Sequence, residues 1–243
     1  MRSGLISTLF DFIAGKADVI DLALAIFSVL AIVLLCLPFH ECAHAAMAHW
    51  LGDDTAMNCG RLTMNPLAHI DPMGALCMCV CSIGWAKPTP VNLSRCRKTS
   101  VRTADILVSM AGPLSNVILA FVFIIASKIL AAANGIVIAS NSSVLTPPGA
   151  ETAGYIVIAL WWIASINAYL AVFNLLPVPP FDGYSLIQGI LPRKAAIWVE
   201  SHAQMINLVV FILLIAGMLG GPLSFLSDKI IWLLDKATGF IKV

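Results

Sequence analysis

Long apolar runs separated by short polar segments dominate the chain. Four of these runs supply the roughly 20 residues that a helix needs to cross a bilayer. They span residues 20–51, 106–133, 155–176 and 203–219, of which the last is the shortest. The pattern predicts about four transmembrane helices joined by short loops.

A fifth apolar run, residues 73–85, is too short to cross as a straight helix, and Pro72 and Pro88 lie just outside its ends. These features favour a re-entrant hairpin buried in the membrane. The segments 55–66 and 87–93 have extended or alternating patterns, which predict short strands around the hairpin. An exposed strand edge there could pair with an unwound substrate backbone, or it could serve only to brace the hairpin.

Both ends of the chain are less regularly apolar. Near the N-terminus the apolar pattern breaks around Asp11 and Lys16, and no cleavage site follows a basic region, so an interfacial helix is expected and a removable signal peptide is not. Near the C-terminus, apolar residues gather on one helical face, as in helices that lie on a membrane surface. We expect an interfacial segment (1–18), one membrane domain (19–221) and a C-terminal amphipathic helix (222–243).

Composition supports a membrane protein. Hydrophobic residues make up 60% of the 243 residues, charged residues make up only 11%, and the mean hydropathy is +0.93. Soluble domains are about 45–50% apolar and about 25% charged, so the predicted fold class is an all-α polytopic membrane protein. The net charge of +1 leaves no basic surface for nucleic acid, which excludes that partner. The seven cysteines include no C-x-x-C pair, so neither a disulfide framework nor a zinc knuckle is expected.

The sequence His40-Glu41-Cys42-Ala43-His44 lies inside the first apolar run. Histidines four residues apart lie about one helical turn apart on the same face, so both imidazoles can bind one zinc ion. Glu41 lies beside them and can accept a proton from a bound water. Polar groups inside an apolar helix cost several kcal/mol unless they are paired or bound. This cost favours a metal site over a pair of buried structural histidines.

A catalytic zinc has three protein ligands and an open position for water, so one more ligand is needed. Asp182 is the candidate, because it follows the third long apolar run and the prolines at positions 177, 179 and 180 stiffen the chain before it. Gly183 permits close backbone approach. The carboxylate could instead, or also, cap a helix that begins near Gly183.

Together, these motifs resemble the site-2 protease family of intramembrane zinc metalloproteases. Members of that family have H-E-x-x-H in one transmembrane helix and Asp-Gly at the end of a later one. Further matching segments lie at residues 65–72 (NPLAHIDP), 84–91 (GWAKPTPV) and 111–116 (AGPLSN). The resemblance implies that His40, His44 and Asp182 bind Zn²⁺ and that Glu41 is the general base. The PDZ and nucleotide-sensing modules of some members are not found, so we expect a minimal form.

Several other polar residues have two possible roles. Asn116 and Asn174 could hydrogen-bond the substrate carbonyl or steady the metal site, roles that the resemblance suggests for Asn116, or they could join helices through their amides. Cys36 lies one turn before the first histidine and is either a soft metal ligand or a small apolar residue. His69 and Asp71 could help to shape the site, although local structural roles are favoured.

Positive charges indicate the orientation in the membrane. Five lysines and arginines lie in residues 87–102, and Arg193 and Lys194 lie in a later loop, which places both loops on the cytoplasmic side. Basic residues near both termini argue for the opposite orientation. The expected location is the cell membrane, which the chain would cross several times.

The sequence therefore predicts a zinc-dependent endopeptidase that acts in the lipid bilayer. Its partner would be a membrane protein substrate, hydrolysed within or next to a transmembrane segment. The alternative is a divalent-metal transporter, because intramembrane histidines and carboxylates also line ion paths. A transporter does not explain a glutamate beside the first histidine, and no inverted repeat is visible. A catalytically silent chaperone is a third hypothesis, which the intact Glu41 disfavours.

Overall fold

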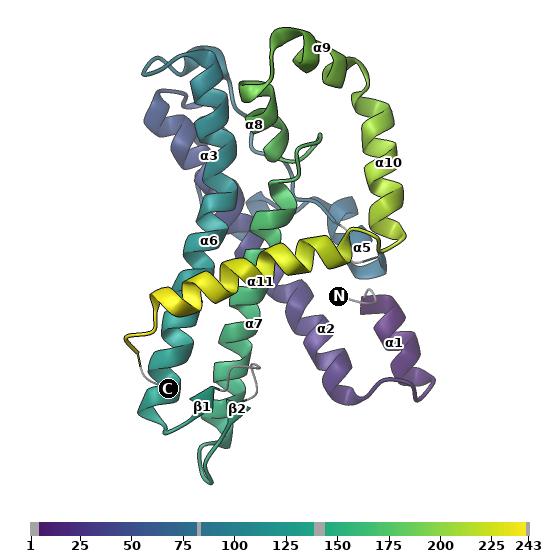
Figure 1. Ribbon diagram of the computed structural model, residues 1–243, viewed down its shortest axis with the longest axis vertical. Coiled ribbons are helices and arrows are strands. Elements are labelled where there is room, and N and C mark those ends of the chain that lie inside the picture. The colour runs from purple at the N-terminus through teal and green to yellow at the C-terminus, as the bar shows by residue number, and fades with distance from the viewer. Residues whose placement is uncertain (1–4, 82–83, 139–143, 242–243) are drawn as a thin grey trace. The chain divides into compact units, whose positions relative to one another are not determined.

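The computed structural model describes residues 5–81, 84–138 and 144–241, and its regular structure is almost entirely helical (Figure 1). Its two short strands pair antiparallel, with Val137 opposite Leu145. In chain order the elements are α1 (Leu5–Ile13), α2 (Val19–Ala31), η1 (Ile32–Cys36), α3 (Leu37–Leu51), α4 (Thr55–Asn58), η2 (Pro66–Ala68), α5 (Pro72–Cys81), η3 (Leu93–Arg95), α6 (Val101–Ala133), β1 (Val137–Ile138), β2 (Val144–Leu145), α7 (Glu151–Asn174), α8 (Gly183–Ile190), α9 (Arg193–Ser201), α10 (Ala203–Ile215) and α11 (Gly220–Ala237).

Among the described residues, three helical segments are long and apolar enough to cross a membrane, namely Val19–Leu51, α6 and α7. A fourth crossing exists if α9 and α10 form one span, which bends by 64° between Lys194–Ser201 and Ala203–Leu214. The predicted all-α polytopic fold with about four spans is confirmed. The last predicted span, residues 203–219, is helical only as far as the end of α10.

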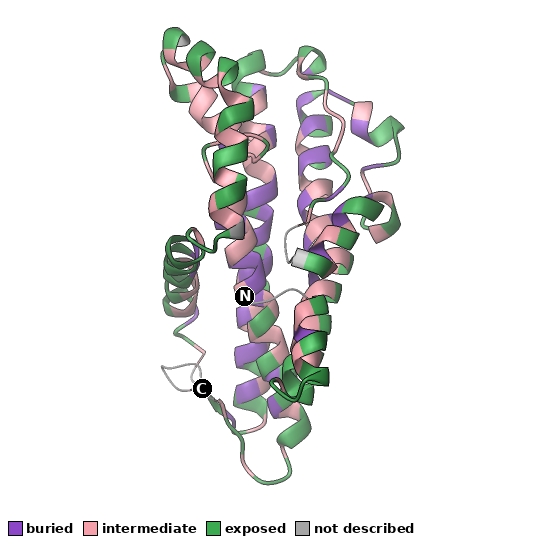
Figure 2. Cartoon of the chain, turned by 90° about the vertical axis from the view of Figure 1, so that its right-hand side faces the viewer, coloured by how far each residue is buried: buried purple, intermediate pink, exposed green. Residues whose placement is uncertain are grey.

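The long helices present apolar side chains on their outer surfaces. Figure 2 shows exposed and half-buried residues along much of their length. Leu30 and Leu34 on the first span are 50% and 49% exposed, and Ile118 and Val122 on α6 are both 51% exposed. Apolar surface of this kind is suited to contact with lipid tails rather than with water. These helices can therefore face the lipid inside a bilayer.

The first span changes its helical geometry just before the H-E-x-x-H motif. The π-helix η1 lies between α2 and α3, and the Leu37 N–H bonds to the Ile32 carbonyl five residues back. Pro38 explains the change, because it has no N–H to donate and its ring crowds the carbonyl four residues earlier. The wider turn lets this proline stay inside the span without ending it.

The fifth apolar run folds back on itself. Its first part is the helix α5, which begins where the Asp71 carboxylate accepts a hydrogen bond from the Gly74 N–H at 2.8 Å. An antiparallel bridge between Ile70 and Ala86 joins the two ends of the run. Residues 82 and 83 of the predicted hairpin lie outside the described residues.

The strands predicted beside this hairpin are wrong in detail. Thr55–Asn58 is helical (α4), because Asp53 accepts hydrogen bonds from the backbone and hydroxyl of Thr55 and so starts a turn there. The segment 87–92 is extended, but the pairing described in this region is limited to the single Ile70–Ala86 bridge. The small sheet lies elsewhere, between α6 and α7.

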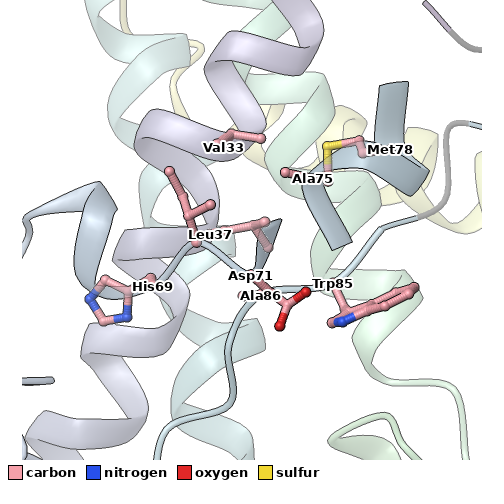
Figure 3. Close-up of a pocket in the computed structure, with 9 residues that line it drawn as sticks. Val33, Leu37, His69, Asp71, Ala75, Met78, Trp85 and Ala86 are labelled. Atoms are coloured by element: carbon pink, nitrogen blue, oxygen red, sulfur yellow. The ribbon is translucent and has the colours of Figure 1, made fainter. Parts of the chain in front are cut away.

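The hairpin packs closely against the first span. Figure 3 shows a pocket lined by Val33 and Leu37 from that span and by Ala75, Met78 and Trp85 from the hairpin, among others. Its volume is about 10 Å³, which is room for no more than about one water molecule. Trp85 and Ala86, at the end of the hairpin, therefore lie beside Val33 and Leu37 of the first span.

Contacts divide the chain into two compact units. The first comprises Met1–Ser115 and Phe173–Gly221, and the second comprises Asn116–Val172 and Pro222–Val243. A buried cluster in the first unit joins the end of α3 to the start of α6 and consists of Ala48, Leu51, Cys96, Ala104 and Val108. These contacts place the motif-bearing helix α3 beside α6.

In the second unit, α11 packs on α6 and α7. Ala120, Ile124 and Ala164 form a buried cluster, against which Ile231 and Leu234 of α11 pack; small residues of this kind let helices approach closely. Lys128 of α6 is only 5% exposed, and its Nζ lies 2.7 Å from a carboxylate oxygen of Asp235 and donates to the Asp235 carbonyl at 3.0 Å. An ion pair therefore attaches the C-terminal helix.

We expect Asp235→Asn to destabilise the protein by about 1–2 kcal/mol, because it leaves the buried Lys128 charge without its counter-ion. Breaking a fully buried pair costs about 3–5 kcal/mol, and the cost here is lower because Asp235 is partly exposed. Thermal unfolding in detergent micelles measures the loss. Asp228→Asn, an exposed change on the same helix, should have little effect. Equal stability of the two variants would contradict this role for the ion pair.

Candidate metal centre

The two histidines of α3 point at the same space. His40 and His44 are 4% and 8% exposed, and their Nε2 atoms lie 3.0 Å apart. The helix is continuous across both, so the four-residue spacing holds the two rings on one face. Both Nε2 atoms are therefore placed to bind a single ion.

The backbone of α6 fixes the tautomer of His44. The Nδ1 atom of His44 lies 2.7 Å from the Val108 carbonyl oxygen. A carbonyl can only accept, so Nδ1 donates, and in the neutral ring Nε2 keeps its lone pair. This is the orientation that a metal-binding histidine requires.

Asp182 completes the group. Its carboxylate oxygens lie 3.1 Å from His40 Nε2 and 3.4 Å from His44 Nε2. Although Asp182 directly precedes α8, its side chain makes no capping hydrogen bond to that helix, so the capping alternative is not what the structure shows. In the part of the chain that the structure describes, the group of His, Cys, Asp or Glu with ligating atoms within 4.8 Å of one another is His40, His44 and Asp182.

The chain around Asp182 is held from two sides. A β-carbon at Gly183 would lie 2.2 Å from the Leu175 carbonyl oxygen, so this close return past the end of α7 requires glycine. Helix α8 in turn is tied to the start of α6, where Arg102 donates to the Gly189 carbonyl and Ser185 bonds to the Asp105 carboxylate. These contacts keep the carboxylate beside the histidines.

The geometry fits a zinc ion. Two nitrogens bound to a tetrahedral zinc at about 2.0–2.1 Å lie about 3.3 Å apart, close to the 3.0 Å found here. Gly112 of α6 leaves the necessary space, because a β-carbon there would lie 2.4 Å from His44 Nε2 and 2.6 Å from His40 Nε2. Two imidazoles and one carboxylate are a donor set of catalytic zinc sites, in which water occupies the fourth position.

The protonation state of Asp182 suits a ligand. Burial works to raise the pKa of its carboxyl group, but when no ion is bound, hydrogen bonds from protonated His40 and His44 and the charges of these rings lower the pKa from 3.8 to about 2. The group is therefore ionised at neutral pH, as a metal-binding carboxylate must be.

Glu41 lies next to His40 in α3 but is not part of the ligand group. Its carboxylate Oε2 accepts a hydrogen bond from the Thr89 N–H at 3.0 Å. Hydropathy and spacing give no sign of Thr89 or of Gly112 as site residues. The sequence signal for them is their place in the matched segments 84–91 and 111–116.

The remaining candidate residues do not join the ligand group. Cys36 is fully buried, Asn116 is 1% exposed in α6 within the second unit, and Asn174 is half-buried at the end of α7. His69 bonds through Nε2 to the Thr63 carbonyl at 2.8 Å, and the Asp71 side chain bonds at the start of α5. His69 and Asp71 thus make local structural bonds, while the substrate-binding roles of Asn116 and Asn174 stay predictions.

We expect His44→Ala and Asp182→Ala to lower the zinc content of the purified protein well below about one ion per chain, because each removes one of three ligands. Elemental analysis after dialysis measures this content. Unchanged zinc in either variant would remove that residue from the ligand set. His202→Ala is the matched control, since His202 lies outside the group.

Gly112→Ala should lower zinc content even though it removes no ligand, because its methyl group would occupy the space beside both Nε2 atoms. Gly220→Ala is the control, since a β-carbon at Gly220 meets nothing within 4 Å. Both variants can be compared by elemental analysis and by the zinc concentration needed for half-saturation. Equal zinc binding by the two would show that the space at Gly112 is not needed.

Comparison with known proteins identifies the family of the chain. The family model described as Peptidase family M50 matches residues 28–217. The chain is 39% identical over 176 residues to "Putative zinc metalloprotease YwhC" of Bacillus subtilis (strain 168), covering 71% of this chain and 74% of that protein. It is 27% identical over 212 residues to "Putative zinc metalloprotease Rip2" of Mycobacterium tuberculosis (strain H37Rv), covering 84% of this chain and 71% of that protein. It is 36% identical over 85 residues to "Putative zinc metalloprotease MJ0611" of Methanocaldococcus jannaschii, covering 33% of this chain and 32% of that protein. No solved structure matches the chain. The chain therefore belongs to peptidase family M50, the family of the site-2 proteases, whose cofactor is zinc.

Proposed function

We propose that this protein is an intramembrane zinc endopeptidase of the cell membrane that cuts a peptide bond within or next to a transmembrane segment of a membrane protein. The observation that carries the proposal is the convergence of His40, His44 and Asp182 within 4.8 Å, with Glu41 beside them on a helix apolar enough to span a membrane. Ionisable groups in that setting mark a functional site, whose substrates would share the bilayer.

The protein residues would divide the chemistry as follows. His40, His44 and Asp182 would hold the ion, and zinc, when bound, lowers the pKa of a water molecule to about 7 and polarises a carbonyl. Glu41 would accept the proton of the attacking water at its carboxylate and deliver it to the leaving nitrogen. Asn116 and Asn174 are the proposed donors to the carbonyl oxygen of the substrate.

We expect Glu41→Gln to abolish cleavage while zinc content stays unchanged, because glutamine keeps the shape of the side chain but cannot accept the proton. The probe is a purified single-span reporter whose apolar segment of about 20 residues contains an Asn-Pro pair, reconstituted with the protein in lipid vesicles. Mass spectrometry of the products locates the cut. Glu200→Gln, an exposed change on α9, should cleave normally.

Retained cleavage by Glu41→Gln would contradict this mechanism. Zinc uptake into vesicles by the parent protein, with no cleavage of the reporter, would instead support the transporter alternative.

If the parent protein cleaves the reporter and Glu41→Gln does not, membrane proteomes of cells with each of the two proteins can be compared. The natural substrate is then the single-span protein that accumulates uncut in cells with Glu41→Gln.

A further inference from the structure

The extended segment after the hairpin is held firmly at its first residues. Arg61 is only 6% exposed, and its guanidinium donates to the carbonyls of Lys87 and Pro88, each at 3.3 Å, and to the carbonyl of Ala68. The Lys87 N–H donates in turn to the His69 carbonyl at 2.8 Å. A buried cation thus clamps the chain just before Thr89.

The same segment is held again three residues after Thr89. Asp53, which has no exposed surface, accepts a hydrogen bond from the Asn92 N–H at 2.6 Å. Asp53 directly follows Gly52, the residue in left-handed conformation that ends α3. The end of the motif-bearing helix is therefore tied to the far end of the segment.

Between these two anchors, Thr89 contacts Glu41 at two points. Its N–H donates to Glu41 Oε2 at 3.0 Å, and its hydroxyl oxygen lies 2.7 Å from the same Oε2 and 3.1 Å from the Glu41 carbonyl oxygen. Pro88 and Pro90 flank Thr89, and a residue before proline is restricted to extended conformations. In this extended conformation the N–H and the hydroxyl of Thr89 both bond to Glu41 Oε2.

We propose that Thr89 is a positioning residue for Glu41. A glutamate side chain has several rotamers, and a general base works best when one is held in place before the substrate arrives. Both bonds from Thr89 end on Oε2, so Oε1 is the oxygen that is directed to the attacking water. The inference rests on the proposed function, in which Glu41 is the base, and it assigns the segment 87–92 a catalytic purpose beyond bracing the hairpin.

The first test compares Thr89→Val with Thr89→Ser. Valine keeps the shape and the backbone N–H but removes the hydroxyl bond to a charged group, so kcat on the single-span reporter should fall about tenfold. KM and zinc content should stay within about twofold of the parent protein, because Thr89 contacts neither the substrate nor the metal ligands in this role. Thr89→Ser restores the hydroxyl and should recover most of kcat.

Thr103→Val is the matched control, since Thr103 lies in the first turn of α6 and its hydroxyl bonds to Ser100, the residue just before that helix. Normal kcat in Thr89→Val would overturn the proposal. A loss confined to KM or to zinc content would also overturn it, and so would a Thr89→Ser variant as slow as Thr89→Val. A tenfold loss of kcat alone, recovered by serine and absent in the control, would support it.

The second test needs neither zinc nor substrate. Thermal unfolding midpoints of the metal-free protein are measured for the parent, Thr89→Val, Glu41→Ala and the double variant. If the contact exists, Thr89→Val lowers the midpoint in the parent background and has a much smaller effect once Glu41 is absent. Equal effects in both backgrounds would overturn the inference at its contact, whereas a reporter left uncut by the parent protein would overturn the proposed function and leave the Thr89–Glu41 contact standing.

Discussion

A polar group inside a bilayer must find a partner, and this requirement shapes the first unit of the protein. An unpaired polar group there costs several kcal/mol. Helix α3 carries two buried imidazoles within a mainly apolar span, and the Asp182 carboxylate and the Val108 carbonyl reach them from other segments. The residues proposed to bind zinc therefore also hold α3, α6 and the loop before α8 together.

Glycine and proline make this arrangement possible at close quarters. Gly112 lets α6 approach both imidazoles, and Gly183 lets the chain turn back past the end of α7. Pro38 is accommodated by a π-helical turn one helical turn before His40. Each of these residues acts through the space that it leaves or the hydrogen bond that it omits, so replacing it by alanine would change the centre without removing a ligand.

Much of the architecture could be predicted because it depends on local pattern. The length of an apolar run is enough to locate a span, and helical periodicity is enough to place His40 and His44 on one face. The strands beside the hairpin could not be predicted in this way, since an extended pattern does not tell whether a pairing partner exists. The roles of Gly112 and Thr89 were likewise hidden, because the contacts of Thr89 with Glu41 join residues 48 positions apart.

The ion pair in the second unit has a consequence for how the chain is made. Lys128 precedes its partner Asp235 by 107 residues, so the ribosome delivers the lysine long before the aspartate. Until then α6 must enter the bilayer with an uncompensated positive charge. The position of Lys128 near the C-terminal end of α6 eases this interval, because a long lysine side chain can reach the aqueous interface from there. Docking of α11 would then be a late step of assembly. It would replace water around the Lys128 ammonium group with Asp235 after the rest of the chain has been inserted.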